Sequence, residues 1–298
     1  MQEQLLDFLA DPHDGGPLTL HAFETHLDST RDGVLLNPRT GDWYVIQDGI
    51  PTLFVRDLRP DDSDFTNRYA SQLRALGCEI GEKNRQLSGD FARIESERRA
   101  RDEQAQDYDQ LLSMKMLGLF EIPVYKNVMS ADDESPFFEA GCGTGRLTHI
   151  FASIAPVVIA ADMSRDSIVR NRARHHGRTR NPVLYVHCDL THQPFKDDAF
   201  GRCANAGVYE HIPSRELRLE FLQHTRRTMR VGGTLMLSAY RYGGVTKFLE
   251  KEGEHDGGIP FFRFTPEELK GEVGTEFYIE KFVSNLGIYM SMIVGRAA

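Results

Sequence analysis

The sequence predicts an α/β protein: a doubly wound, mostly parallel sheet that closes with an antiparallel hairpin, preceded by a small α+β module. Two patterns support this fold class. After Pro136, short apolar runs alternate with amphipathic stretches of helical period, as parallel strands and crossover helices require. The last two apolar runs, at 276–283 and 287–295, follow one another without a helix, which is typical of a hairpin.

The first part of the chain, residues 1–56, reads as the small module. We expect a short helix at 4–9 and strands at 18–20, 33–36, 43–46 and 50–55. So few residues bury too little surface to fold alone, so the apolar side of this module should pack on the rest of the chain. Residues 57–104 are expected to form a linker and a helical lid, with a charge-rich helix from 95 to 106 that continues to 116.

The third part, residues 105–298, carries the main sheet. Its strands are expected at 137–140, 157–161, 183–188, 202–207 and 234–239. Helices are expected between or after them, at 146–153, 165–175, 215–229 and 266–273.

Composition excludes several classes of protein. No apolar run among the 298 residues reaches the length of a membrane span, and the acidic N-terminus does not resemble a secretory signal, so we expect a cytoplasmic protein. The four cysteines are far apart and form no CxxC pair, which favours neither disulfides nor a metal site. A net charge of −9 does not favour nucleic acid as a partner. The basic stretch 165–180 is interpreted as a solvated helix face.

A glycine-rich turn at 139–145 leaves one predicted strand and enters a helix. Gly141, Gly143 and Gly145 lack a Cβ, so the backbone can take positive φ and approach a ligand closely. Asp162 follows Gly141 by 21 residues and ends the next strand, where a carboxylate can accept both hydroxyl protons of a ribose. The pattern therefore predicts a cofactor that contains a sugar.

A third strand end converges on the same place. Asp189 could accept a hydrogen bond from an adenine amino group, with Met163 and Leu190 flanking the ring. A dinucleotide fold is the main alternative, but its glycines are spaced GxGxxG. Here the spacing is different, an acidic residue precedes the turn, and a hairpin closes the chain, which favours S-adenosylmethionine (SAM) over NAD. The predicted cofactor-binding residues are Glu139, Gly141, Cys142, Gly143, Gly145, Asp162, Met163, Asp189, Leu190 and Asn205.

Residues from about 105 to 298 resemble the class I SAM-dependent methyltransferases, particularly the broad group that acts on small molecules. The resemblance rests on Asp162 and on the segments 139–145, 188–190, 194–195, 198–200, 208–213 and 230–233. It implies a Rossmann-like, seven-stranded sheet with SAM as cofactor.

Residues 1 to about 56 resemble a second family, the small zinc-ribbon-like activators of tRNA and protein methyltransferases, through 5–10, 16–18 and 48–51. Zinc-binding members place two cysteine pairs where this chain has Asp11 and Asp14, then Asn37 and Thr40. These side chains supply no thiolate, so we expect a module without metal, kept for packing or for shaping the substrate pocket.

Methyl transfer from a sulfonium is an in-line displacement, and a general base is needed only when the acceptor holds its proton near neutral pH. His211 and Tyr209 follow the fourth strand and are the candidate catalytic residues; alternatively, Glu210 and His211 only fix the following loop. The candidate substrate residues are Tyr69, Tyr108, Tyr240, Arg241 and Arg263.

Three functions remain open from the sequence. The first is methyl transfer to a small molecule, as in specialised metabolism, favoured by the acidic charge and the aromatic segment 258–264. The second is methyl transfer to RNA or protein, to which the activator-like module points. The third is a protein that binds SAM without methylating. A homodimer is compatible with each.

Overall fold

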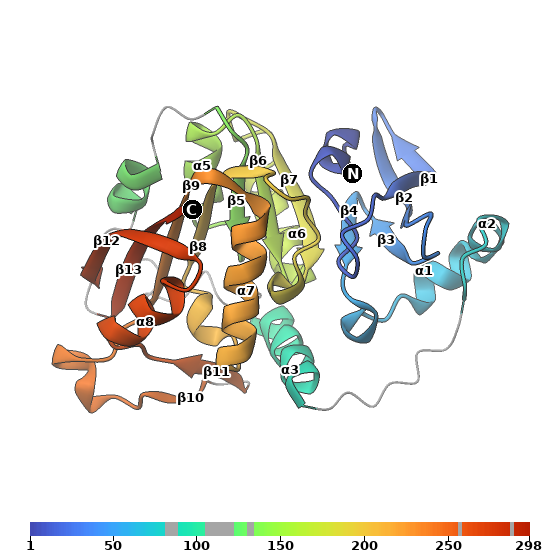
Figure 1. Ribbon diagram of the computed structural model, residues 1–298. Helices are drawn as coiled ribbons and strands as arrows, with labels where there is room; N and C mark the ends of the chain where they lie inside the picture. Colours follow the sequence, from blue (N-terminus) through green and yellow to red (C-terminus); the bar gives the residue numbers. More distant parts are fainter. Residues whose placement is uncertain (81–88, 105–121, 130–133, 256–257, 287–288) are drawn as a thin grey trace.

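The computed structural model describes residues 1–80, 89–104, 122–129, 134–255, 258–286 and 289–298. Within them, one sheet of eleven strands runs across the molecule in the order β1-β2-β3-β4-β7-β6-β5-β8-β9-β13-β12 (Figure 1). The first four strands are β1 (Thr19–His26), β2 (Ser29–Leu36), β3 (Trp43–Gln47) and β4 (Ile50–Leu53). The other seven are β5 (Phe137–Ala140), β6 (Val158–Asp162), β7 (Val183–Cys188), β8 (Phe200–Ala206), β9 (Met229–Tyr240), β12 (Phe277–Leu286) and β13 (Met290–Ala297).

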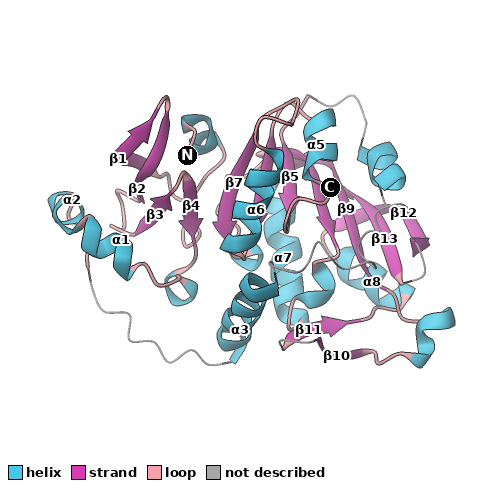
Figure 2. Ribbon diagram, turned by 180° about the vertical axis from the view of Figure 1, so that it is seen from behind, coloured by secondary structure: helices cyan, strands magenta, loops and turns pink. Residues whose placement is uncertain are grey.

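These seven strands confirm the predicted fold class. Strands β7, β6, β5, β8 and β9 are parallel, and β13 and β12 close the sheet antiparallel. The covering helices are α5 (Thr148–Ile154), α6 (Arg165–His175), α7 (Arg215–Thr228) and α8 (Pro266–Val273). Helices α7 and α8 pack on one face, seen in Figure 1, and α5 and α6 pack on the other, seen in Figure 2. Each face therefore buries its own apolar core.

The helices begin where the sequence supplies caps. Ser164 and Ser214 precede α6 and α7, and their hydroxyl groups accept hydrogen bonds from the backbone N–H of the third helical residue. Thr265 forms a capping box with Glu268 at the start of α8, and Pro266 takes the first helical position. These local signals explain why the predicted bounds of α6 and α8 agree with the structure.

The N-terminal module continues the main sheet. Strand β4 pairs parallel to β7, with Thr52 opposite His187 and Leu53 opposite Cys188. The 3-10 helix η1 (Glu3–Asp7) packs beside it, and Leu5 and Leu53 join the core beneath α7. The expected packing of the module on the rest of the chain therefore occurs, and it does so through backbone pairing as well as apolar contact.

Asp11, Asp14, Asn37 and Thr40 lie in two facing loops, and their polar groups are hydrogen-bonded. Asn37 Nδ2 donates to Asp11 Oδ2 at 2.9 Å and to Asp14 Oδ1 at 3.1 Å. The hydroxyl of Tyr44 also donates to Asp11, at 3.0 Å, and the backbone N–H of Asp42 donates to Thr40 Oγ1 at 3.1 Å. Hydrogen bonds thus hold these two loops together.

The segment after the module differs in part from the expected linker. Two short helices, α1 (Ser63–Arg68) and α2 (Ala70–Ala75), pack on the module's sheet through Phe65 and Leu73. Each of these helices has too few apolar residues to show a helical pattern in the sequence, so its formation depends on tertiary contacts.

Helix α3 (Gly89–Gln104) begins earlier than predicted, and its expected continuation to 116 lies outside the described residues. It lies at the end of the sheet toward which β4 and β7 point (Figure 2). A separate hairpin of β10 (Glu252–His255) and β11 (Ile259–Phe262) contains most of the predicted aromatic segment. Among the helices that the structure describes, none has the length and apolar character needed to cross a membrane.

Candidate functional site

A cavity lies at the carboxyl ends of the central strands. Glu139 of β5 lines it, as do Gly141, Cys142 and Gly143 of the turn that follows. Asp162 ends β6 and Met163 follows it, while Asp189 and Leu190 follow β7. Ile94, Glu97 and Arg101 of α3 face these strand ends from across the cavity. The structure thus brings together eight of the ten predicted cofactor-binding residues, at the edge where open α/β sheets bind ligands.

The glycine turn needs its glycines for different reasons. Gly141, Gly143 and Gly145 all have positive φ, at 84°, 49° and 91°. A Cβ on Gly141 would stand 2.4 Å from Cγ2 of Val208, so the turn packs against the segment after β8. Gly145 does not line the cavity: its missing Cβ makes room for Asn171 and His175 of α6. Gly145 is therefore a packing glycine and not the predicted ligand contact.

Gly145→Ala is expected to destabilise the fold by about 1–3 kcal/mol more than Gly177→Ala. Both residues have positive φ, at 91° and 65°, so both substitutions strain the backbone. Only at Gly145 would the new Cβ also meet side chains, 2.6 Å from Asn171 Oδ1 and 2.7 Å from His175 Nε2, whereas Gly177 has open space. Urea unfolding of the two variants measures the difference. Equal free energies of unfolding would contradict the packing explanation.

Asp162 ties the turn to the next strand end. Its Oδ2 accepts the backbone N–H of Gly143 at 2.8 Å, and its Oδ1 accepts that of Ser164 at 2.9 Å. Each carboxylate oxygen keeps a further lone pair, so a ligand's hydroxyl groups can still donate to it. Asp189 accepts hydrogen bonds from the backbone N–H and the hydroxyl of Thr191, at 3.0 and 2.5 Å, and contacts His192 Nδ1 at 2.9 Å. Both carboxylates are thus fixed in place before any ligand binds.

The cavity carries acidic groups in an apolar environment. Burial raises the pKa of Glu139 to about 8, although the Thr148 hydroxyl donates to this carboxyl group at 2.7 Å. Burial also raises the pKa of Glu97 to about 7, against the effect of Arg101, and raises the pKa of Asp162. With Asp189, four carboxyl groups line the cavity beside two arginines, Arg101 and Arg146. Because Glu97 and Glu139 lose their protons only around pH 7 and pH 8, the negative charge of the described lining grows as the pH rises.

The structure separates the two candidate catalytic residues. Tyr209 is fully buried beside Phe264, and its hydroxyl donates to Glu272 Oε2 at 2.7 Å. Glu272 also receives two hydrogen bonds from Arg218, both at 2.9 Å. Tyr209 is absent from the described lining of the cavity. The expectation that it is catalytic is therefore corrected: its side chain belongs to a buried ion pair beneath the site.

His211 is held in one orientation near the cavity. Its Nδ1 lies 2.8 Å from the carbonyl oxygen of Pro260. A carbonyl can only accept, so Nδ1 carries the proton and Nε2 has the lone pair. Burial keeps the pKa of His211 well below its ordinary value, and the nearby charges of Arg101 and His255 act in the same direction. The ring is therefore neutral at pH 7, as a general base must be.

Several other predicted residues lie elsewhere. Asn205 is buried below the cavity and is not among its described lining residues. Its Nδ2 donates to the carbonyl oxygen of Ala140 at 3.0 Å, and its Oδ1 accepts the backbone N–H of Tyr209 at 3.2 Å. Asn205 therefore joins β5 to β8. The hydroxyl of Tyr69 lies 2.7 Å from Glu24 Oε1 and 2.8 Å from Asp32 Oδ2 and donates its one proton between these two carboxylates, which places it on the N-terminal sheet. The substrate role predicted for Tyr69 is corrected accordingly. Tyr108 lies outside the described residues.

Among the remaining substrate candidates, Tyr240 lies next to His211 and Arg263 lies next to Tyr240. The ring of Tyr240 lies 5.5 Å from that of His211, and the guanidinium of Arg263 lies 5.7 Å from the ring of Tyr240. The backbone of Arg241 is held by a hydrogen bond of 2.7 Å to the carbonyl oxygen of Tyr289. Ile212 and Pro213, directly after His211, line the cavity. This cluster therefore adjoins the cavity where an acceptor would approach a bound cofactor.

Sequence reasoning missed the contribution of α3. Glu97 and Arg101 face the cavity and lie 3.5 Å apart as an i,i+4 ion pair. The i,i+4 spacing is visible in the sequence and is typical of a charged helix. Only the packing of α3 across the strand ends shows that these two side chains face the cavity.

Comparison with known proteins agrees with this geometry. Residues 138–237 match the family model of a methyltransferase domain. The chain is 24% identical over 134 residues to the human "Probable tRNA methyltransferase 9B", a match that covers 45% of this chain and 27% of that protein. The chain thus spans about a quarter of the length of this curated relative.

Two solved structures share the fold. One is a Burkholderia thailandensis 1,6-didemethyltoxoflavin-N1-methyltransferase with bound 1,6-didemethyltoxoflavin and S-adenosylhomocysteine, with a TM-score of 0.58, 14% identity, and coverage of 74% of this chain and 95% of that one. The other is the complex of the Haloferax volcanii Trm112 methyltransferase activator with a putative methyltransferase, with a TM-score of 0.53, 15% identity, and coverage of 66% and 97%.

Proposed function

We propose that the chain is a class I SAM-dependent methyltransferase that transfers a methyl group from SAM to a small-molecule acceptor; the match of residues 138–237 to the family model of a methyltransferase domain supports the proposal. The observation that carries the proposal is the convergence of the glycine turn, Asp162 and Asp189 on one cavity. The acidic lining and the net charge of −9 favour a small acceptor over a polyanion. The fold is shared with a methyltransferase solved with bound 1,6-didemethyltoxoflavin, a small molecule, which supports the same choice.

We assign the cofactor contacts from the geometry of the cavity. Asp162 would accept the ribose hydroxyls with the lone pairs that Gly143 and Ser164 leave open. Asp189 would accept from the adenine amino group, and Met163 and Leu190 would flank the ring. The backbone of Gly141, Cys142 and Gly143 would run along the ligand, since a Cβ on Gly143 would project into open space. Glu139 contributes a further carboxyl group to the cavity.

SAM supplies a methyl carbon bonded to a positively charged sulfur. A lone pair of the acceptor forms the new bond to this carbon while the carbon–sulfur electrons pass to sulfur, which leaves S-adenosylhomocysteine (SAH). Where the acceptor atom carries a proton, His211 Nε2 is the group we propose to take it, because the Pro260 carbonyl fixes the other ring nitrogen as the donor. Tyr240 and Arg263 would contact the acceptor beside it.

The affinity for SAM relative to SAH is expected to rise from pH 6 to pH 9, by a few-fold to about tenfold. The two ligands differ by the positive charge on sulfur. Glu97 and Glu139, with pKa values of about 7 and about 8, ionise in this range and add negative charge to the cavity. Calorimetric titrations at several pH values measure the ratio of the two dissociation constants. Glu139→Gln should reduce the change of this ratio with pH. A wild-type ratio that does not change between pH 6 and pH 9 would contradict the assignment.

A second candidate function is methyl transfer to RNA. The human relative named as a probable tRNA methyltransferase favours it, as does the resemblance of residues 1–56 to activators of such enzymes. We infer that this module is a fused, metal-free counterpart of those activators, with the Asp11–Asn37 hydrogen bond in place of a metal.

A homodimer and a cytoplasmic location stay predictions.

The formation of SAH in the presence of different acceptors distinguishes the candidates. Purified protein is incubated with SAM and, in separate reactions, a panel of phenols, amines and nitrogen heterocycles or total tRNA. Turnover with a small acceptor and none with tRNA is the expected result. Turnover with tRNA alone would favour the second function, and SAM that is bound but never consumed would favour a protein that binds without methylating.

A further inference from the structure

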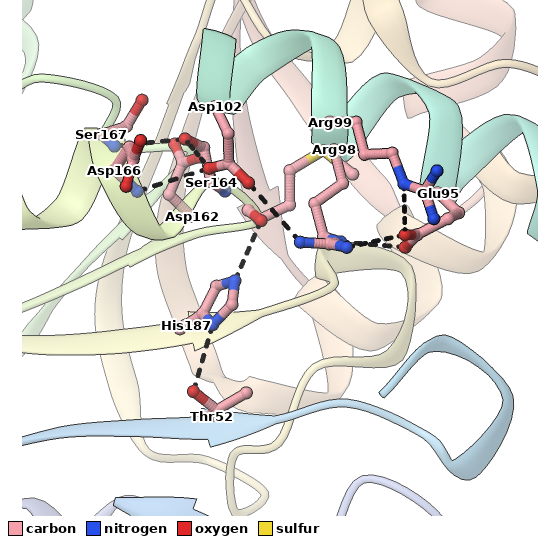
Figure 3. A network of polar contacts seen from close by, with 11 residues as sticks. Thr52, Glu95, Arg98, Arg99, Asp102, Asp162, Ser164, Asp166, Ser167 and His187 are labelled. Carbon is pink, nitrogen blue, oxygen red and sulfur yellow. Dashed lines mark hydrogen bonds and ion pairs between the residues drawn. The ribbon is translucent and has the colours of Figure 1, made fainter. Parts of the chain in front are cut away.

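A chain of partly buried hydrogen bonds joins the N-terminal module to the cavity (Figure 3). Thr52 Oγ1, in β4, lies 3.1 Å from His187 Nδ1, in β7. On the other side of the ring, His187 Nε2 lies 3.1 Å from the carbonyl oxygen of Met163. Met163 lines the cavity and directly follows Asp162. Two hydrogen bonds therefore lead from a residue of the module to the backbone of the loop that would hold the ribose.

The direction of each hydrogen bond follows from the acceptor at its end. The Met163 carbonyl can only accept, so Nε2 of His187 donates and Nδ1 has the lone pair. The Thr52 hydroxyl must then donate to Nδ1. Burial lowers the pKa of His187 to about 3, and the charges of Arg165 and Arg98 act in the same direction, so the ring is neutral. One neutral tautomer satisfies both ring nitrogens: the Met163 carbonyl selects it, and the Thr52 hydroxyl supplies the donor that Nδ1 then needs.

The loop from Asp162 to Ser164 is held on its other side by α3. Ser164 Oγ donates to Asp102 Oδ1 at 2.7 Å, and the backbone N–H of Asp166 lies 3.3 Å from the same oxygen (Figure 3). The loop thus rests between the lid helix and His187. A carboxylate that must meet two ribose hydroxyls depends on such support, because small displacements of a binding group weaken a hydrogen-bonded ligand strongly.

We propose that Thr52 and His187 are positioning residues for the cofactor, and that the N-terminal module thereby forms part of the SAM site without touching the ligand. This inference rests on the proposed function. Without the Thr52 hydroxyl, Nδ1 of the buried ring loses its donor, so the ring is held by a hydrogen bond on one side only and the loop loses part of its support. The module then contributes to cofactor affinity through one hydroxyl group.

The test compares Thr52→Val, which keeps the shape of the side chain but removes the donor, with Thr52→Ser, which retains it. Thr25→Val, at an exposed position of β1, is the matched control. Calorimetry with SAH should show a dissociation constant about 5- to 30-fold higher for Thr52→Val. Thr52→Ser and Thr25→Val should stay within about twofold of the wild type.

Two further measurements separate positioning from general stability. Nitrogen-15 NMR of the histidines should show His187 protonated at Nε2 in the wild type and in Thr52→Val, with the chemical shift of Nδ1 moving toward that of a nitrogen without a hydrogen bond only in the variant. His187→Gln, whose amide can donate to Met163 and accept from Thr52, should bind SAH better than His187→Phe, which keeps only the ring packing on Phe54.

Unchanged SAH affinity in folded Thr52→Val would overturn the inference even if His187→Phe does not fold. Wild-type protein that binds neither SAM nor SAH would overturn the proposed function, and the inference with it. If Thr52→Val and His187→Phe both bind SAH as tightly as the wild type does, the inference is wrong and the proposed function is unaffected.

Discussion

Asp162→Ala is expected to weaken the binding of SAM and SAH by roughly 100-fold or more. The substitution removes the carboxylate that would accept the ribose hydroxyls. It also leaves the N–H groups of Gly143 and Ser164 without the acceptor they have at 2.8 and 2.9 Å, so the glycine turn and the loop after β6 lose their connection. Both consequences act on the same ligand, which is why this single change should have the largest effect on binding.

Asp166→Asn is the matched control for that experiment. Asp166 lies four residues further along the chain, in the first turn of α6, and is exposed. Calorimetric titration with SAH should give a dissociation constant within about twofold of the wild type for Asp166→Asn, as expected of a surface substitution. If Asp162→Ala is folded and binds SAH as tightly as this control, the ribose assignment is wrong.

Glu272→Gln is expected to lower the free energy of unfolding by about 3–5 kcal/mol. Glu272 is buried, and it accepts two hydrogen bonds of 2.9 Å from Arg218 and one of 2.7 Å from the hydroxyl of Tyr209. The amide has nearly the same shape but no charge, so it leaves the buried guanidinium of Arg218 uncompensated. Removal of one partner from such a pair is costly because the other charge stays buried.

Urea denaturation compares Glu272→Gln with Glu267→Gln, an exposed position on the same helix α8. The control should change the free energy of unfolding by less than about 0.5 kcal/mol. Tyr209→Phe removes only a hydrogen bond to a charged group, so it should cost about 1.5–3 kcal/mol while retaining SAM binding. A Tyr209→Phe variant of wild-type stability would place this hydroxyl outside the buried pair and reopen its catalytic role.

The parts of the fold that local sequence determines were predictable. Strand β7 and helices α6 and α8 have the predicted bounds, since a cap or a change of hydrophobic period marks their ends. The glycine turn, Asp162 and Asp189 could be placed together because parallel strands bring their carboxyl ends to one edge of the sheet. Topology alone thus located the cavity.

Features that depend on contacts between distant segments could not be predicted. The sequence of residues 50–53 does not show that they pair with β7, because a short apolar strand can pair with several other strands. The same holds for Tyr209, whose position after β8 suggested a catalytic role although its hydroxyl turns toward α8. Tyr69 looked like part of a lid until its contacts with Glu24 and Asp32 placed it on the N-terminal sheet.

The most direct test of the central claim is calorimetric titration of the wild-type protein with SAM, SAH and NAD in parallel. We predict that SAM and SAH bind at one site per chain and that NAD does not compete with them, because the carboxyl groups of Glu97, Glu139, Asp162 and Asp189 in the cavity disfavour the negatively charged diphosphate of NAD. Binding of NAD with no binding of SAM or SAH would contradict the account and would assign the glycine turn to a dinucleotide instead.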